Sequence, residues 1–206
     1  MLDVLGKSTS INVRKVLWLC QLLGLEYRHL GADGTHSGDA AALQSRNPNG
    51  LVPVIRDGDF VLWESNSICR YLASRAQRHD LLPQEPQARA QVEQWMDWQA
   101  TDLNTAWRYV FMSRVRQHPA YTDEAAAATS LAQWSRLMQQ LDQQLADTRA
   151  YVAGPVFTLA DIVLGLSTQR WLMTPGEKPD LPAVQAWFGR LAGHAGFDQH
   201  CRNGIP

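Results

Sequence analysis

The spacing of hydrophobic residues in the first part of the chain changes from that of a strand to that of a helix and back. Residues 2–5 form a short apolar run that ends at Gly6, and apolar residues then recur three or four positions apart through residues 13–23. Residues 26–30 return to a period of two. The order strand, amphipathic helix, strand is typical of a crossover between parallel strands. This stretch therefore predicts a β-α-β unit.

Two β-rich runs, residues 52–55 and 60–63, flank the dipeptide Asp57-Gly58. An Asp-Gly pair between such runs is typical of a type I′ hairpin, because both central residues of that turn have positive φ. We therefore expect the two runs to pair antiparallel. Pro53 has no amide hydrogen to donate, so it leaves a backbone position that another molecule can meet.

A glycine-rich stretch at residues 31–38 precedes a short helical pattern at residues 39–46, and residues 65–75 have helical spacing. The first 76 residues therefore have the order β-α-β, short helix, β-β-α. This order predicts a mixed four-stranded sheet with helices packed on it.

The remainder of the chain has helical spacing throughout. Residues 77–87 contain two prolines and no regular period, which is typical of a linker. Apolar residues recur at helical spacing in 87–115 and 123–148, and further helices open at Thr158 and near Pro182. We therefore expect an α/β plus all-α protein with a first domain at residues 1–76, a linker at 77–87 and an all-helical domain at 88–206.

Composition and charge narrow the class of protein. The 206 residues include 45% hydrophobic residues and have a net charge of -1. This balance gives no attraction to nucleic acid or to anionic membranes. There is no basic start followed by an apolar core and no apolar run of spanning length, so we expect a cytoplasmic protein. Three cysteines without CxxC spacing indicate neither a disulfide framework nor a metal site.

Several separated motifs occur along the chain: Ser10 before the first helix, Val52-Pro53, Glu64-Ser65, the segment 95–98 and the segment 157–162. Together they resemble the cytosolic glutathione transferase family, in particular its serine-type, theta- and phi-like members of bacterial style. The resemblance runs over essentially the whole chain. It implies a thioredoxin-like first domain that binds glutathione and a helical second domain that contributes the electrophile site.

The resemblance also implies how glutathione binds. The Val52-Pro53 bond is cis in such proteins, and the Val52 backbone pairs with the cysteinyl part of the tripeptide. Ser65 takes the γ-glutamyl carboxylate at the start of a helix, and Glu64 meets the ammonium group. The alternatives are a trans proline at a strand edge and a Ser65 that only caps a helix.

Ser10 is the catalytic residue that the resemblance implies, because its hydroxyl stabilises the thiolate of glutathione. The alternatives are that Ser10 only caps the helix, that Ser8 or Thr9 supplies the functional hydroxyl, or that Asn12 contacts the sulfur instead. His36 is a candidate contact to the glycyl carboxylate, against the more frequent case of a surface histidine. Leu51 stands where many relatives have Gln or Lys.

Thr158 and Asp161 have the spacing of a capping box, in which a hydroxyl and a carboxylate close the first turn of a helix reciprocally. We therefore expect a structural role for both residues rather than a catalytic one.

The electrophile pocket is expected to lie between the two domains, where the first long helix and the helix that opens at Thr158 face the Ser10 loop. Its candidate lining residues are Tyr109, Met112, Arg116, Arg170 and Trp171. The resemblance implies a homodimer that conjugates glutathione, as co-substrate, to hydrophobic electrophiles in detoxification. The alternatives are a low-activity ligand-binding or partner-binding protein on the same fold and a specialised glutathione-dependent peroxidase, isomerase or dehalogenase.

Overall fold

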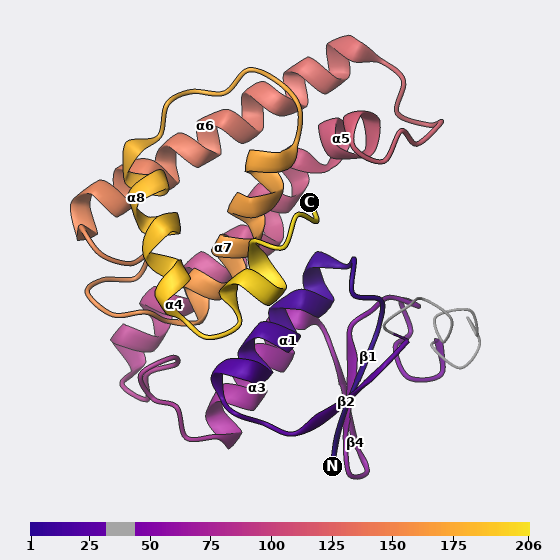
Figure 1. The fold of residues 1–206 in the computed structure, drawn as a ribbon, viewed down its shortest axis with the longest axis vertical. Helices are drawn as coiled ribbons and strands as arrows, with labels where there is room; N and C mark the ends of the chain where they lie inside the picture. The colour runs from indigo at the N-terminus through magenta and orange to yellow at the C-terminus, as the bar shows by residue number, and fades with distance from the viewer. Residues whose placement is uncertain (32–43) are drawn as a thin grey trace. The chain divides into compact units, whose positions relative to one another are not determined.

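The computed structural model describes residues 1–31 and 44–206, and these form two compact units (Figure 1). The first unit contains residues 1–83 together with 193–205, and the second contains residues 84–192 and Pro206. The expected short helix at residues 39–46 lies largely outside the described residues.

A four-stranded sheet forms the centre of the first unit. The strands are β1 (Leu2–Leu5), β2 (Tyr27–Leu30), β3 (Val54–Asp57) and β4 (Phe60–Trp63), in the order β2-β1-β3-β4. β1 is parallel to β2 and antiparallel to β3, and β3 is antiparallel to β4. The predicted mixed sheet and its parallel crossover are confirmed.

The hairpin turn lies one residue later than expected. Asp57 pairs with Phe60, so the central turn residues are Gly58 and Asp59. Gly58 has φ 62, whereas Asp59 does not have positive φ. The type I′ turn centred on Asp57-Gly58 was therefore a wrong prediction, since that turn needs positive φ at both central positions. β3 also begins at Val54 rather than two residues earlier, after the proline that cannot donate to the ladder.

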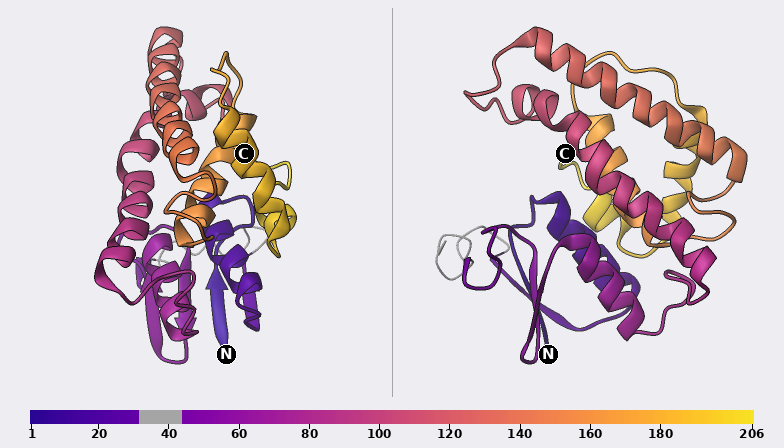
Figure 2. Two further views of the ribbon diagram at one scale, coloured as in Figure 1. Left: turned by 90° about the vertical axis from the view of Figure 1, so that its left-hand side faces the viewer. Right: turned by 180° about the vertical axis from the view of Figure 1, so that it is seen from behind.

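Two helices of the first unit, α1 (Ile11–Leu22) and α3 (Ser65–Arg75), pack against each other beside the sheet (Figures 1 and 2). Apolar residues at helical spacing on each helix are fully buried, among them Val13, Leu17, Ile68 and Leu72. This buried face holds both helix starts in place.

Residues 193–205 belong to the first unit, although the sequence analysis kept them with the helical domain. The segment η4 (Phe197–Cys201) packs against α1. The Phe197 ring lies 5.6 Å from the Trp18 ring, and the Trp18 indole donates to the Ala195 carbonyl at 3.0 Å. This attachment is made by contacts distant in sequence, which periodicity does not reveal.

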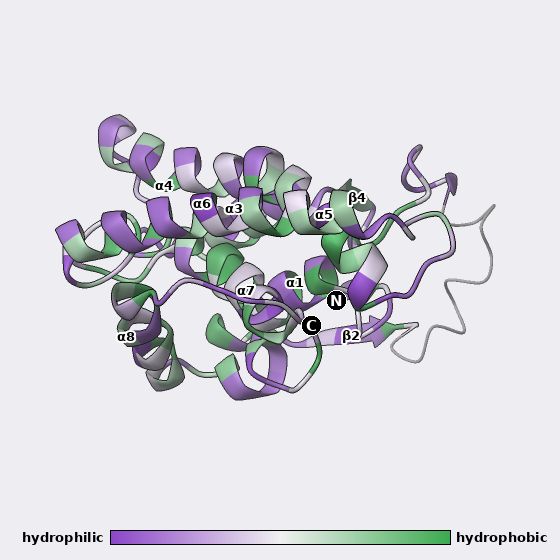
Figure 3. Ribbon diagram, turned by 90° about the horizontal axis from the view of Figure 1, so that it is seen from above, coloured by the Kyte–Doolittle hydropathy of each residue, from purple (hydrophilic) through white to green (hydrophobic). Residues whose placement is uncertain are grey.

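The second unit is helical and contains α4 (Pro86–Trp98), η2 (Gln99–Leu103), α5 (Asn104–Arg114), α6 (Glu124–Thr148), α7 (Leu159–Met173) and α8 (Pro182–Arg190). The short turn η3 (Leu191–Gly193) spans the boundary between the two units in the sequence. α5 packs on α6, α4 on α7, and α6 on α8. Hydrophilic and hydrophobic positions lie side by side along α4 and α8 (Figure 3), as in amphipathic helices. In the described part of the chain, no helix has the length and apolar character to cross a membrane.

The capping box at the start of α7 is confirmed. The Asp161 carboxylate accepts from the Thr158 amide at 2.8 Å and from its hydroxyl at 3.1 Å. Its other oxygen accepts from the Val152 amide at 3.0 Å and from the Trp187 indole at 2.8 Å. Burial raises the pKa of Asp161 to about 6 despite these donors. The residue therefore holds three segments of the second unit together.

Candidate functional site

Ser10 occupies the N-cap position of α1 with an extended backbone, φ -78 and ψ 122. Its carbonyl accepts from the Arg14 amide at 3.0 Å, which starts the helix. Its half-buried hydroxyl makes no cap hydrogen bond to the first turn. The alternative in which this hydroxyl caps the helix therefore lacks the bond that defines it. The hydroxyl stands at the positive end of the helix dipole, where a donor to an anion is favourable.

The other candidates near the sulfur site lie in the same stretch. Thr9 is exposed in the loop before α1, and Asn12 is half-buried in the first turn. Both lie within two residues of Ser10, so the loop and the first turn together offer three polar side chains around one helix start.

Val52 and Pro53 lie in the segment before β3, and the peptide bond between them is cis. Gly6, at the end of β1, brings this segment and α1 together. A β-carbon built on Gly6 comes within 2.5 Å of the Val13 side chain and within 2.8 Å of the Val52 Cβ. Gly6 has φ 137, a conformation that favours glycine. The loop that carries Ser10 therefore starts from a point packed against Val52.

Gly6 is a positioning residue that the sequence analysis did not select. The sequence indicates the role of Gly6 only in part, because it shows a glycine between an apolar strand and a polar loop. Its crowding by Val13 and Val52 depends on contacts that cannot be inferred from spacing.

Glu64 and Ser65 lie at the junction of β4 and α3. Glu64 is the N-cap of α3, with φ 71, and makes no side-chain cap hydrogen bond. The alternative in which Ser65 is the N-cap is therefore wrong, because Ser65 is the first residue of the helix and is buried. First-turn amides without a side-chain cap attract a carboxylate. Positive φ at a residue other than glycine costs free energy and is frequent at ligand sites.

A buried hydrogen bond links the two helix starts. Lys15 in α1 is 1% exposed, and its ammonium donates to Asn66 Oδ1 at 3.2 Å. Asn66 follows Ser65, and Lys15 lies in the second turn after Ser10. The sequence analysis missed this pair, since a lysine on an amphipathic helix usually faces solvent.

The structure thus places Ser10, Asn12, Val52, Pro53, Glu64 and Ser65 within one unit, at two helix starts and the segment before β3. His36 lies outside the described residues. Leu51 is 63% exposed, so the position where many relatives have a polar side chain is accessible here.

The candidate electrophile residues all lie in the second unit. Trp171 is buried against Trp134, with ring centroids 5.1 Å apart. The buried Arg170 guanidinium lies 4.4 Å from the Trp107 ring and 4.1 Å from the Phe111 ring. These contacts give Arg170 and Trp171 a role in the core of this unit, and their assignment as pocket lining stays a prediction.

The other three electrophile candidates, on and just beyond α5, are more accessible. Tyr109 and Met112 are half-buried, and Arg116 is exposed. The Tyr109 hydroxyl accepts from the Asp123 amide at 3.2 Å.

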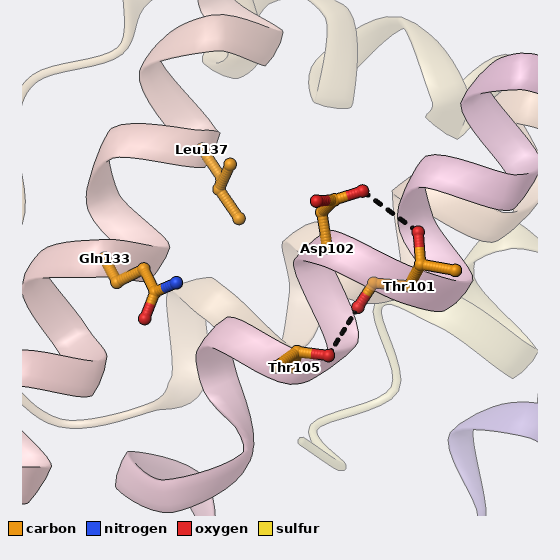
Figure 4. A pocket seen from close by; sticks show the side chains of 5 residues that line it. All are labelled: Thr101, Asp102, Thr105, Gln133 and Leu137. Carbon is orange, nitrogen blue, oxygen red and sulfur yellow. Dashed lines mark hydrogen bonds between the residues drawn. The ribbon is translucent and has the colours of Figure 1, made fainter.

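A pocket of about 250 Å³ lies in the second unit between η2, α5 and α6 (Figure 4). Thr101, Asp102 and Thr105 face Gln133 and Leu137 across it. The Thr101 hydroxyl donates to Asp102 at 3.0 Å, and the Thr105 hydroxyl donates to the Thr101 carbonyl at 2.7 Å. None of the five candidate electrophile residues lines this pocket.

Two family models match the chain. The N-terminal domain of glutathione S-transferase matches residues 5–83, and the C-terminal domain of glutathione S-transferase matches residues 103–195.

Individual relatives agree with these family models. Glutathione S-transferase GstB of Escherichia coli (strain K12) is 34% identical over 197 residues, which is 93% of each chain. Glutathione S-transferase 3 of Zea mays is 32% identical over 96% of this chain and 92% of its own. The crystal structure of the theta class glutathione S-transferase of Xanthomonas axonopodis pv. citri with glutathione bound matches with a TM-score of 0.89. It shares 36% identity and covers 100% of this chain and 99% of that chain. The chain belongs to the glutathione S-transferase family.

Proposed function

We propose that this protein is a glutathione transferase in which the Ser10 hydroxyl stabilises the thiolate of glutathione for addition to a hydrophobic electrophile. The observation that carries the proposal is the Ser10 hydroxyl at the start of α1, which makes no cap hydrogen bond. The theta-class relative with glutathione bound supports glutathione as the co-substrate.

One side chain can supply the free energy that stabilises the thiolate of glutathione at pH 7. A thiol with a pKa near 8.5 is only a few per cent ionised at pH 7, and lowering the pKa by about two units needs roughly 2.7 kcal/mol. A hydrogen bond to a charged acceptor contributes about 1.5–3 kcal/mol, and a helix N-terminus adds about 0.3–1 kcal/mol. Ser10 at the start of α1 is therefore sufficient without a general base.

Glutathione is positioned by the rest of the first unit in this proposal. The Val52 backbone before Pro53 pairs with the cysteinyl part, and Ser65 at the start of α3 binds the γ-glutamyl carboxylate. The exposed Glu64 carboxylate faces the ammonium group. The Lys15–Asn66 hydrogen bond and the crowded Gly6 hold these segments together.

The electrophile is accepted by the second unit, and we retain Tyr109, Met112 and Arg116 as its candidate contacts. We further propose a cytoplasmic homodimer with a role in detoxification, as the family membership suggests.

The test is the ultraviolet thiolate absorbance of bound glutathione, titrated against pH. Wild type is expected to show a thiol pKa about two units below that of free glutathione, because the thiolate gains the Ser10 hydrogen bond. Ser10→Ala is expected to lose most of this shift, whereas Thr9→Ala and Asn12→Ala keep it. Glutathione binding is measured in parallel by calorimetry.

The outcomes separate the function from the residue assignment. A wild-type thiol pKa equal to that of free glutathione contradicts catalysis by thiolate activation and favours a ligand-binding protein on this fold. A lowered pKa that persists in Ser10→Ala but not in Thr9→Ala or Asn12→Ala moves the role to the other residue. A screen of electrophiles and hydroperoxides then distinguishes conjugation from peroxidase, isomerase or dehalogenase activity.

A further inference from the structure

A second pocket lies within the first unit, between α1, β2 and the η4 segment. Its volume is about 210 Å³, and its lining includes Ser8, Arg14, Tyr27, His29, His200 and Asn203. None of the residues that line it binds glutathione in the proposed function, although Ser8 is one of the alternatives to Ser10. At about 30 Å³ per water molecule, this space corresponds to roughly seven waters, which suits an organic molecule of a few carbon atoms.

His200 is the group in this pocket that most needs a partner. Its side chain is 6% exposed, and its Nε2 atom has no hydrogen-bond partner among residues 1–31 and 44–206. A buried polar atom without a hydrogen bond costs free energy, so such an atom in a pocket wall indicates a place where a ligand atom is favourable.

The charge around His200 is positive. Arg14 is 1% exposed, and its guanidinium donates to Asn203 Oδ1 and to the Ile205 carbonyl, both at 2.9 Å. Burial, His29 and Arg14 together lower the pKa of His200 to about 4, so the positive field reaches its imidazole. No Asp or Glu is among the residues that line the pocket. The carboxylate on the same segment, Asp198, is paired with Arg202 at 2.9 Å.

The other polar side chains of this pocket favour a ligand that accepts hydrogen bonds. The His29 Nε2 atom lies 2.7 Å from the Gly6 carbonyl oxygen and donates to it, which fixes this ring. Ser8 and Tyr27 add hydroxyl groups to the wall. A cation, a buried imidazole and hydroxyl donors around one small space form the donor set that binds a carboxylate.

We propose that this pocket, between α1, β2 and the η4 segment, binds a small organic carboxylate through Arg14 and His200. The site is separate from the proposed glutathione residues and does not rest on the proposed function. The bound anion places its negative charge beside His200, which favours the protonated imidazole and raises the pKa of His200.

The experiment compares acetate and malonate with acetamide, which has nearly the shape of acetate but no charge. The full-length ¹⁵N-labelled protein is titrated at constant ionic strength, and the imidazole signals of His200 and His29 are followed by NMR. Saturable shifts with acetate and malonate but not with acetamide are expected, together with a higher pKa of His200 in the presence of malonate. His200→Leu is expected to weaken binding about tenfold or more, because a hydrogen bond to a charged ligand is lost.

Two controls keep the result interpretable. His79→Leu changes an exposed histidine of the same unit outside the pocket and is expected to leave the affinity unchanged. Ser10→Ala is expected to bind acetate as wild type does. A failure of the proposed glutathione function can therefore be distinguished from a failure of the carboxylate site. Equal shifts with acetamide, no saturation, or unchanged affinity in His200→Leu overturns the proposal. If His200→Leu does not fold, the comparison of acetate with acetamide on wild type decides.

Discussion

Gly6 packs so closely against Val52 that a β-carbon built on Gly6 lies 2.8 Å from the Val52 Cβ, closer than real β-carbons approach. This contact joins the end of β1, where the Ser10 loop begins, to the segment that contains the cis peptide bond.

Gly6→Ala is therefore expected to destabilise the protein by about 1–3 kcal/mol, because the added methyl group overpacks the contact with Val13 and Val52. Urea unfolding measures the loss. Gly154→Ala is the matched control: Gly154 has φ 140, close to the φ of 137 at Gly6, but a β-carbon there has no heavy atom within 4 Å. The control has the backbone strain alone and is therefore expected to lose less stability than Gly6→Ala. Equal losses in the two variants contradict the crowding argument.

The positive φ of Glu64 predicts opposite changes in stability and binding. Glu64→Gly is expected to raise the free energy of unfolding by about 1 kcal/mol, since the strain is relieved, and to weaken glutathione binding. Glu64→Gln keeps the strained backbone and removes the charge, so it is expected to weaken binding without a gain in stability. Calorimetry and thermal unfolding measure the two quantities.

The control for Glu64 is Gln77→Gly, at another residue with positive φ, 54. It is expected to gain stability with unchanged glutathione binding. If Glu64→Gln binds glutathione as wild type does, the proposed contact with the ammonium group is wrong.

Asp3 predicts a pH dependence of stability. Its carboxylate is 1% exposed and pairs with Arg28 at 2.7 Å and Arg56 at 2.6 Å. The hydrogen bond from Arg28, above all, and then that from Arg56 lower the pKa of Asp3 to about 2 against the opposing effect of burial. The folded state therefore holds its proton less tightly than the unfolded state, whose pKa is about 3.9. The stabilisation is present above that value and is lost as the pH falls towards 2.

Asp3→Asn is expected to be less stable at pH 7 and to lose less stability than wild type as the pH falls from about 4 to about 2. Chemical unfolding at several pH values measures this difference. Asp59→Asn, at an exposed turn position, is expected to follow the wild-type curve. Parallel curves for wild type and Asp3→Asn are inconsistent with a lowered pKa at Asp3.

The Trp187 indole donates a hydrogen bond to Asp161, so replacing Trp187 is expected to cost more stability than replacing the buried Trp134. Trp187→Phe is expected to lose about 2 kcal/mol or more, because a donor to a buried carboxylate is removed. Trp134 is also fully buried, but its Nε1 atom has no hydrogen-bond partner among the described residues. Trp134→Phe is therefore expected to lose less, and unfolding of the two variants gives the comparison. A larger loss in Trp134→Phe contradicts a dominant role for the hydrogen bond.

Local features of this protein were predictable from its sequence. Hydrophobic periods of two and of three or four residues predicted the strands and helices, because each face of an element is set by residues close in sequence. The Thr158–Asp161 capping box was equally predictable, since both partners lie within one turn. Local spacing placed Ser10 and Ser65 at helix starts, and the resemblance to the glutathione transferase family then selected them as site residues. Even the hairpin was placed within one residue, although Pro53 shifted the start of β3 and the turn proved to be centred on Gly58 and Asp59.

The tertiary structure decided everything that depends on contacts between distant residues. The sequence does not show that Gly6 meets Val52, that the buried Lys15 bonds Asn66, or that Trp187 completes the Asp161 site. It also gave no sign that residues 193–205 pack on α1 and place His200 in one pocket with Arg14. These relationships arise because packing brings together side chains whose separation along the chain has no period, and local propensity carries no information about them.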